Sequence, residues 1–533
     1  MSTTVAKPPR SEQSPARRSW LADLGRRCVV AGFVAALMVP GLAIAISPNF
    51  RSAVGNVLIN FSTAGQQREI VRNTTPLWTG AADLYGHLLY RLGTSPNLAI
   101  GVLGKDDFIF LGDFYNDSFS QSIHRQALSR EAATAWAETL AAERDWLARR
   151  GIPMLFVVGP TTGTIYPDKL PDWAQTELSR PSSFDEVLSV GREKGLNLPL
   201  VDVRRDLIDA RSRADTYSRL NSHWNDFGAW VAWQRVAGEL GARLKAFKPF
   251  GVDDLTRVVT LQGAGHSEFA RLLGLDGLPN PWNTYELSQP FPEMEIEDAA
   301  GNVSKDSARA ETGLLDMPRK TRVADAPTRA RALIVRDSMG NGLSPFLQAS
   351  FSETVQIDHH VTYARIKDVN LVGAAERYKP DVVIYVMTER LFEEPLGDLD
   401  FWRAANLFDE GDAAADLTWR AGGESHGLKA DGDTRLLAPL AFTATPPAGL
   451  PASAWVLRVD AGAAFPGTVR LDFTAGGVAR SIGQTFRLGE NPMFFRLPGD
   501  VDPASLRLVS TGKGVVDVRG ATLRPVTNNA AGL

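Results

Sequence analysis

The sequence predicts an α/β domain, in which a mainly parallel sheet carries helices on both faces. An N-terminal transmembrane helix precedes this domain and a C-terminal antiparallel β-sandwich follows it. Three observations support the prediction. Strand-like apolar runs alternate with helical patterns between residues 96 and 395, period-two strands dominate from 435 to 527, and residues 28–46 contain no charged side chain.

The composition limits the class of protein. A chain of 533 residues is long for one hydrophobic core and favours two folded domains. The hydrophobic fraction of 44% and the charged fraction of 22% are those of a globular protein. The formal net charge of −4, without a Lys/Arg stripe in the folded part, argues against nucleic acid as a partner.

The N-terminal residues differ from the rest of the chain. Residues 1–27 are polar and basic, and the uncharged run 28–46 follows them. At about 1.5 Å per residue this run would span roughly 28 Å, close to the bilayer core. Because a basic flank stays in the cytoplasm, the sequence predicts a cytoplasmic tail, a single-pass inner-membrane signal anchor and folded domains in the periplasm. The alternative is a cleaved signal peptide, since Ala43-Ile44-Ala45 has the small-x-small form of a cleavage site.

Cys28, the only cysteine, lies within the apolar run. An exported domain without cysteine has no disulfide, no Cys-ligated zinc and no thiol nucleophile, so covalent catalysis would need an oxygen or nitrogen nucleophile. The pair His359-His360 is predicted to lie at the surface, because adjacent side chains of a strand point to opposite faces and cannot both bind one ion. We therefore expect neither a metal nor a cofactor.

The α/β domain is predicted over residues 96–395, after a juxtamembrane segment (47–95). Two apolar runs flank Gly104-Lys105-Asp106-Asp107 and predict a hairpin over 97–113. The later expected elements are, in order, a helix over 130–150, strands over 152–160 and 197–203, a helix over 226–244, a strand over 331–338, a helix around 344–351, a strand over 354–358, a helical stretch near 367–378 and a strand over 380–390. Such alternation favours a parallel sheet, whose ligands bind at the carboxyl ends of the strands.

The C-terminal third changes in character. Residues 396–434 are rich in Asp, Gly and Ala and predict a linker. Residues 435–527 alternate with period two between turn residues and predict an antiparallel β-sandwich. The sandwich is either a carbohydrate-binding module that uses aromatics such as Trp455, Phe494 and Phe495, or a structural cap in which these residues form the core.

Ser338 is the candidate nucleophile. It ends the predicted strand 331–338 in the run RDSMGNG (336–342), directly before a predicted helix. A serine at this junction projects from the ligand-binding edge of the sheet, and the glycines let nearby backbone N–H groups act as oxyanion donors. The alternative is an Asp-Ser pair that only caps the helix. Ser118 is a weaker candidate, because it follows the hairpin and lacks a strand-to-helix junction.

His223 is the candidate general base and lies in RLNSHWNDFGAW (219–230). Polar side chains surround Trp224 there, ahead of an apolar helix, which is typical of an aromatic-walled site. The alternative is a histidine that is hydrogen-bonded within a helix-start turn. A third stretch, VGPTTGTIYPDKLP (158–171), runs from a strand end into a loop at the same sheet edge, and either lines a pocket or is a plain connection.

Four stretches together resemble the AlgX/AlgJ-type, alginate-like polysaccharide O-acetyltransferases, whose catalytic domain is SGNH-hydrolase-like. In the order of the family they are IGVLGKDDFIFLGD, VVGPTTGTIYPDKLP, TYSRLNSHWNDFGAWVAW, and LIVRDSMG followed by PDVVIYVMTERLF. They extend over about residues 97–392. The resemblance implies an SGNH-hydrolase-like α/β fold in which the histidine precedes the serine along the chain.

By this resemblance Ser338 is the nucleophile and His223 is the general base. The acid of the family's Asp-x-His-Trp motif falls on Asn221, so the sequence departs from the pattern there. The Pro-x-Lys lysine of the family is also absent, and Thr161-Thr162-Gly163 stands in that place. The residues expected to support the site are Asp337, Asp226, Arg336, Asn341, Trp224, Tyr166 and Thr161.

The departure at Asn221 has a physical cost. Replacing the triad aspartate by asparagine lowers the rate of a serine protease about 10⁴-fold, although an amide oxygen can still accept from the ring N–H. We expect Asp226, Asp215 or Asp337 to substitute for the missing acid.

The resemblance implies acetyl transfer to hydroxyls of an exopolysaccharide outside the cytoplasm, through an acetyl-serine at Ser338. A polysaccharide would be the acceptor, and a membrane-bound O-acyltransferase would supply the acetyl group. Two other functions remain open. One is a polysaccharide acetylesterase or deacetylase with water as the acceptor, and the other is a catalytically weak polysaccharide-binding subunit of an acetylation complex, which Asn221 keeps open.

Overall fold

The computed structural model describes Arg27, Val30, Ala31 and residues 76–263, 265–313, 316–359, 370–393, 396–446, 452–487, 489–511 and 515–526. The predicted transmembrane run 28–46 lies outside these residues except at Val30 and Ala31 and stays a prediction. Among the described residues, no helix combines the length and apolar character needed to cross a bilayer. Helix α4 (Pro76–Arg91) begins the continuous described part of the chain. The elements that follow it belong to the compact unit Tyr90–Leu533.

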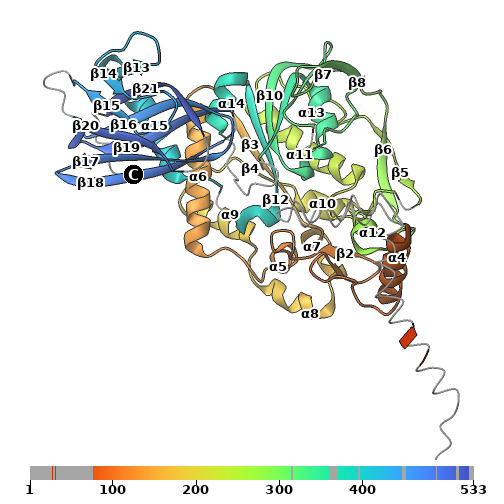
Figure 1. The fold of residues 1–533 in the computed structure, drawn as a ribbon. Coiled ribbons are helices and arrows are strands. Elements are labelled where there is room, and N and C mark those ends of the chain that lie inside the picture. The colour runs from red at the N-terminus through yellow and green to blue at the C-terminus, as the bar shows by residue number, and fades with distance from the viewer. Residues whose placement is uncertain are drawn as a thin grey trace, which may run out of the picture. The chain divides into compact units, whose positions relative to one another are not determined.

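The described residues form a central eight-stranded sheet with the order β4-β3-β12-β10-β11-β9-β7-β8 (Figure 1). The strands are β3 (Met154–Gly159), β4 (Leu200–Asp202), β7 (Glu293–Glu297), β8 (Val303–Ser307), β9 (Arg319–Arg322), β10 (Thr328–Arg336), β11 (Phe351–Asp358) and β12 (Val382–Thr388). Strands β4, β3, β12, β10 and β11 pair in parallel, with Ile334 opposite Ile384, as the sequence predicted. Strands β9, β7 and β8 extend the sheet in antiparallel pairing, and the sequence patterns did not predict these three strands.

Helices cover both faces of this sheet, as predicted. Alternation along β3 sends Leu155 and Val157 into one core and Phe156 and Val158 into the other, which is the two-residue period of a strand. One core also contains side chains of α11 (Asp226–Arg243) and α13 (Ser344–Ser350). The other contains side chains of α6 (Arg130–Ala148), α9 (Ser183–Glu193), α14 (Leu371–Tyr378) and α15 (Leu399–Glu410). The sheet is therefore buried on both sides.

Local signals explain where the long helices begin and end. Ser129 caps α6 by accepting from the N–H of Ala132, and Gly151 follows the helix with a left-handed φ of 72°. Asn225 caps α11 by accepting from the N–H of Gly228. This cap fixes the point at which the chain leaves the His223 loop and enters α11.

The α/β domain and its junction with the sandwich also contain shorter elements. The hairpins are β1 (Gly101–Leu103) with β2 (Ile109–Leu111), which confirms the predicted hairpin, and β5 (Leu255–Leu261) with β6 (Trp282–Leu287). The short helices are α5 (Ser118–Ser122), α7 (Thr162–Ile165), α8 (Asp172–Gln175), α10 (Arg204–Ala210) and α12 (Glu268–Leu273). The 3₁₀ turns are η2 (Pro167–Lys169), η3 (Thr176–Ser179), η5 (Ser338–Asn341), η6 (Glu389–Glu393) and η7 (Ala413–Ala415).

The C-terminal residues form a sandwich of two antiparallel sheets with the orders β13-β21-β16-β19 and β14-β15-β20-β17-β18 among the described residues (Figure 1). The first sheet contains β13 (Leu417–Arg420), β16 (Ala454–Ala463), β19 (Gly489–Pro498) and β21 (Val516–Val526). The second contains β14 (Leu428–Asp431), β15 (Leu440–Ala444), β17 (Gly467–Ala475), β18 (Val478–Phe486) and β20 (Val501–Ser510).

The stretch 396–434 differs from the expected linker. It contains α15, and its strands β13 and β14 pair with β21 and β15 of the sandwich. Leu417 and Leu428 are buried in the sandwich core, which explains why this Asp-, Gly- and Ala-rich stretch is folded. Its polar residues form the turns between short strands.

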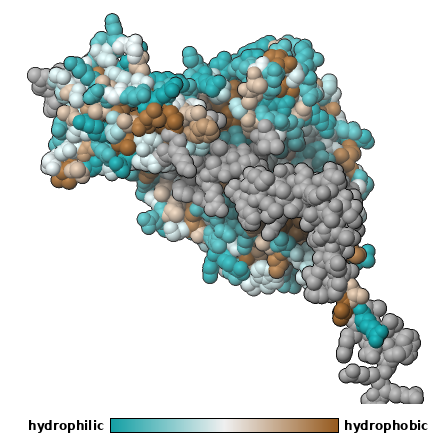
Figure 2. All heavy atoms as spheres, in the orientation of Figure 1, coloured by the Kyte–Doolittle hydropathy of each residue, from teal (hydrophilic) through white to brown (hydrophobic). Residues whose placement is uncertain are grey.

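The aromatics considered for sugar binding lie inside the protein. Trp455, Phe494 and Phe495 have exposed fractions of 5%, 1% and 0%. Phe494 contacts Phe401 and Phe408 of α15 edge-on, and so joins the sandwich to the α/β domain. Because stacking on a sugar needs an exposed ring, these residues support the structural-cap alternative. The surface seen in Figure 2 is mostly hydrophilic, with apolar residues in small separate groups.

Candidate active site

Ser338 lies where the sequence placed it, at the carboxyl end of β10 and the start of η5. Asp337 fixes this turn. One carboxylate oxygen accepts from the N–H of Met339 at 2.9 Å, and the other accepts from the N–H and the hydroxyl of Thr388 at 2.7 and 2.6 Å. Burial alone would raise the pKa of Asp337, but His359, Arg390 and Thr388 hold it well below its usual range. The ionised carboxylate therefore joins the nucleophile turn to the end of β12.

The turn also differs from one expectation. The backbone N–H groups after Ser338 were predicted to face an oxyanion, yet the Met339 N–H is bonded to the Asp337 carboxylate and the Gly340 N–H to the Asp337 carbonyl. These two donors are used within the turn.

Arg336 lies beneath the turn and is fully buried. Its guanidinium donates to Gln356 at 2.7 Å, to the Asp337 carbonyl at 2.9 Å and to the Asn341 side-chain oxygen at 2.7 Å. Burial lowers the pKa of Arg336 to about 10. A Cβ at Gly340 would overlap the Arg336 side chain, so glycine is required for this packing. Arg336 and Asn341 thus support the turn, and no bond from either to His223 is found among the described residues.

His223 reaches Ser338 across the sheet edge. Its Nε2 lies 2.8 Å from the Ser338 Oγ. The loop that carries it is closed by an antiparallel bridge between Tyr217 and Trp224. Tyr217 also donates its hydroxyl to the Pro160 carbonyl at 2.6 Å, so the stretch 158–171 supports the histidine loop. The contact between His223 and Ser338, which are 115 positions apart, is the central geometric expectation from the sequence.

The other ring nitrogen of His223 faces oxygens. Its Nδ1 lies 3.1 Å from the Asn221 Oδ1 and 3.2 Å from the Ser222 Oγ. Asn221 therefore occupies the place expected for the third residue and can accept the ring N–H. Its amide group also donates to the His266 carbonyl at 2.6 Å.

Glu268 is the residue that the sequence reasoning missed. One of its carboxylate oxygens lies 3.6 Å from the His223 Nδ1 and accepts from the Ser222 hydroxyl at 2.6 Å and the Ser222 N–H at 3.0 Å. It is the first residue of α12, where a glutamate normally indicates only a favourable helix start. The signal that could have drawn attention to it is an acid beside His266 in a segment otherwise poor in regular structure.

The three acids expected to replace the missing carboxylate are used elsewhere. Asp226 accepts from Trp282 at 3.0 Å and from Thr284 at 2.7 Å. Asp215 accepts from the hydroxyl of Tyr166 at 3.3 Å. Asp337 holds the nucleophile turn instead, so the expectation of a substitute among these three is wrong.

Among the described residues, the side chains of the remaining predicted residues form no hydrogen bond with His223 or Ser338. Trp224 is buried against Gly342, and its indole N–H has no hydrogen-bond partner among the described residues. Tyr166 is buried and accepts from the N–H of Thr216 at 2.9 Å. Thr161 caps α7 and donates its N–H to Glu389 at 3.2 Å, while burial raises the pKa of that carboxyl. Tyr166 and Thr161 therefore shape the loop framework.

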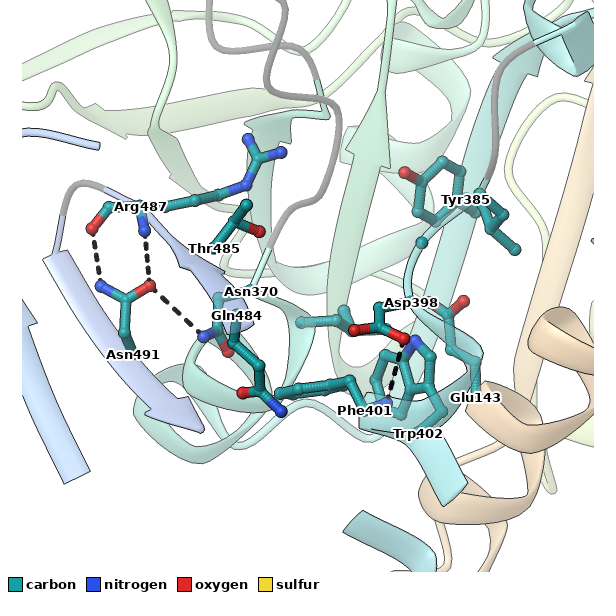
Figure 3. A pocket seen from close by; sticks show the side chains of 13 residues that line it. Glu143, Asn370, Tyr385, Asp398, Phe401, Trp402, Gln484, Thr485, Arg487 and Asn491 are labelled. Carbon is teal, nitrogen blue, oxygen red and sulfur yellow. Dashed lines mark hydrogen bonds between the residues drawn. The ribbon is translucent and has the colours of Figure 1, made fainter. Parts of the chain in front are cut away.

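A small hollow lies next to the histidine loop. Its lining is mostly hydroxyl groups and backbone with one cation, contributed by Phe110, Leu111, Ser118, Ser122, Thr161, Thr162, Gly163, Ser222 and Arg390. Ser118, the weaker nucleophile candidate, belongs to this lining, and its carbonyl accepts from the Ser122 hydroxyl at 2.8 Å. A second hollow lies away from the reacting pair, between α14, α15 and the β18–β19 region, and none of the predicted site residues lines it (Figure 3).

His359 corrects another expectation. It was predicted to be a surface residue, but its exposed fraction is 2% and its Nε2 lies 3.6 Å from the Asp337 carboxylate. The reason is that β11 lies beside β10, so both strands end at the same edge and deliver His359 beneath the Ser338 turn. His360 lies outside the described residues. Within the described part of the chain, no cluster of three or more His, Cys, Asp or Glu side chains is arranged to hold a metal.

Comparison with known proteins finds the family that the sequence resembles. Residues 102–324 match the family model described as the SGNH hydrolase-like domain of the acetyltransferase AlgX. The chain is similar to the AlgX/AlgJ-type O-acetyltransferases. The matched segment includes His223 and Glu268 and ends before Ser338.

Individual relatives are distant. The probable alginate O-acetylase AlgJ of Pseudomonas aeruginosa is 23% identical over 204 residues, which cover 38% of this chain and 49% of that protein. The chain thus spans about half the length of this curated relative. Among solved structures, Pseudomonas aeruginosa AlgX has a TM-score of 0.44 at 16% identity, covering 83% of this chain and 98% of that one. Bacillus cereus PatB1 has a TM-score of 0.41 at 16% identity, covering 56% and 98%.

Proposed function

We propose that this AlgX/AlgJ-type chain is an active O-acetyltransferase that esterifies hydroxyls of an exopolysaccharide through an acetyl-serine at Ser338. The observation that carries the proposal is the 2.8 Å contact between the His223 Nε2 and the Ser338 Oγ at a strand-to-helix junction. A serine is a weak nucleophile by itself, and an adjacent general base is what activates it. The relative named as a probable alginate O-acetylase supports the choice of acetyl groups and a polysaccharide.

The proposed reaction has two halves that use the same two side chains. In the first, the Ser338 oxygen attacks the carbonyl of an acetyl donor while His223 takes the serine proton on Nε2 and then passes it to the leaving group. In the second, a sugar hydroxyl gives its proton to the same nitrogen and attacks the acetyl-serine, and His223 returns that proton to the Ser338 oxygen as the bond between this oxygen and the acetyl group breaks. The oxyanion would be held by the N–H of Ser338 itself, because the first N–H groups of a helical turn have no acceptor within that turn.

The location and partners belong to the same proposal. The apolar run 28–46 with its basic flank supports an inner-membrane anchor with the folded domains in the periplasm. Acetyl donors are made in the cytoplasm, so a membrane-bound O-acyltransferase would deliver the acetyl group to Ser338. The acceptor would be a polysaccharide on the periplasmic side.

The test uses the purified full-length protein with p-nitrophenyl acetate as the donor and alginate or cello-oligosaccharides as acceptors. We expect release of nitrophenolate, a protein mass increased by one acetyl group on the peptide containing Ser338, and acetylated sugar. Ser338→Ala should abolish all three, and His223→Gln should lower the rate of nitrophenolate release by about 10³-fold or more.

Ser118→Ala is the matched control, because Ser118 also follows an aspartate but has no bond to a histidine among the described residues. Wild-type acetylation by the Ser338→Ala variant would refute the proposed nucleophile. If acetate is released at the same rate with and without sugar, and no acetylated sugar forms, the site belongs to an esterase that uses water.

A further inference from the structure

The surroundings of His223 fix which ring nitrogen carries the proton. The Ser222 hydroxyl donates to the Glu268 carboxylate at 2.6 Å, so its oxygen can only accept from the ring. The Asn221 Oδ1 and the Glu268 carboxylate also lie on this side, at 3.1 and 3.6 Å from Nδ1. Three acceptors around Nδ1 favour the tautomer with hydrogen there. The Nε2 lone pair is then free for the Ser338 hydroxyl.

In an ordinary triad one aspartate both orients the histidine and supplies a negative charge, and here Asn221 and Glu268 each take one of these roles. Asn221 carries no charge, but its Oδ1 also accepts the backbone N–H of His223 at 3.0 Å and its amide donates to the His266 carbonyl at 2.6 Å. It therefore braces the histidine loop against the segment that leads into α12. Glu268 supplies the negative charge near Nδ1 that the neutral Asn221 amide lacks.

The carboxylate of Glu268 is ionised in the folded protein. Burial alone would raise its pKa, but His223 and the two donors of Ser222 outweigh that effect and bring the pKa to about 2. The side chains of His223 and Glu268 are 27% and 24% exposed, so solvent screens their attraction only in part.

We propose that Glu268 is the acid of this active site, a positioning residue that stabilises the protonated His223 ring in place of the carboxylate missing at Asn221. This inference rests on the proposed function of Ser338 and His223. When the serine proton moves to Nε2, the ring holds two protons and a positive charge. Glu268 stays a carboxylate and keeps no proton, and the ring returns to neutral when it protonates the leaving group.

The test compares Glu268→Gln, Asn221→Asp and the double variant, with Glu286→Gln as the matched control because Glu286 is an exposed glutamate paired with Arg257. We expect Glu268→Gln to lower kcat about 10²-fold with little change in KM. The loss is smaller than the about 10⁴-fold of a serine protease, because Asn221 still holds the tautomer. Asn221→Asp alone should bring no gain, since it crowds two carboxylates and loses the donor to His266.

The double variant is the decisive arm. With glutamine at 268 and aspartate at 221, the charge returns to the position used by the family motif, and we expect at least a tenfold recovery over Glu268→Gln alone. Glu268→Asp keeps the charge on a shorter side chain and should retain more activity than Glu268→Gln. A parent-like kcat in Glu268→Gln, a large gain in Asn221→Asp alone, or no recovery in the double variant would each overturn the assignment.

A second readout does not depend on acetyl transfer. In full-length protein with ¹³C-labelled histidine, only seven ring signals are present, and His223→Gln identifies the one of interest. We expect the ring signals of His223 at pH 7 to shift in Glu268→Gln, because the carboxylate 3.6 Å from Nδ1 becomes a neutral amide, and to stay unchanged in Glu286→Gln. If the signals shift but the parent transfers no acetyl group, the proposed function fails while the contact is real. If the signals do not shift, the role of Glu268 fails.

Discussion

Asp337→Asn is predicted to destabilise the fold because the nucleophile turn depends on an ionised carboxylate. Asp337 is buried, and its acceptor bonds include one from Met339 and two from Thr388. An asparagine has one acceptor oxygen and one amide group. If the oxygen faces Thr388, the amide faces the Met339 N–H, and two donors then oppose each other in a buried place.

The asparagine side chain has two orientations, and the magnitude is worked from the one that loses fewer hydrogen bonds. Keeping both bonds to Thr388 still removes one bond to a charged acceptor and leaves the Met339 N–H without a partner, which costs about 1.5–3 kcal/mol. The lowered pKa of Asp337 shows that its surroundings more than offset the desolvation of the charge, so neutralisation brings no compensating gain. We expect the free energy of unfolding to fall by about 3 kcal/mol.

Urea unfolding of the full-length protein, followed by tryptophan fluorescence, measures this loss. Asp325→Asn is the control, because Asp325 is exposed. A carboxyl whose pKa is lowered by folding stabilises above its unfolded pKa of 3.8, and this contribution is lost as the pH falls below that value. The difference between parent and variant should therefore be complete at pH 7 and shrink below about pH 4. A variant as stable as the parent at pH 7 would refute the reasoning.

Three further predictions concern the pH dependence and the packing. Because folding lowers the pKa of Glu268 from 4.5 to about 2, its contribution to stability is complete above pH 4.5 and declines towards pH 2, so the urea midpoints of parent and Glu268→Gln should converge across that window. Gly342→Ala places a Cβ 2.9 Å from the Trp224 Nε1 and should cost about 1–3 kcal/mol, whereas Gly241→Ala, with open space in α11, should raise the thermal midpoint. Phe494→Ala should cost about 3–5 kcal/mol and expose the α15–sandwich contact to limited proteolysis, and unchanged cleavage would contradict this.

The parallel part of the sheet could be predicted because it depends on local patterns, whereas the pairing of Ser338 with His223 was implied by the resemblance to the acetyltransferase family. A short apolar run that ends in Asp-Ser indicates a strand end, and all parallel strands present such ends at one edge. His359 reaches the same edge by this rule, but its burial depends on β11 lying next to β10, and sequence order does not give strand order. The linker was misjudged for a related reason, since β13 and β14 are short and their partners lie far along the chain.

Glu268 could not be predicted from the motif, because its closeness to His223 depends on how a segment 46 residues away from Ser222 folds back. A local pattern contains only neighbours along the chain. The aromatics of the sandwich illustrate another limit. The alternation of apolar residues places Trp455 and Phe494 in strands, but it does not show which face of each sheet is covered by another part of the protein. Burial of both faces, one by the second sheet and one by α15, decides it.

The carboxylate of Glu268 comes from a different segment than the histidine it faces, and this affects how relatives are judged. A search that requires an acid two positions before the histidine would classify this chain as a degenerate copy without activity. If the charge can move to a helix start that folds against the same ring, loss of the motif acid in a related sequence is weak evidence for loss of chemistry. Sequences with asparagine at this position are better sorted by whether the segment between α11 and β7 offers a glutamate or aspartate at the start of its short helix.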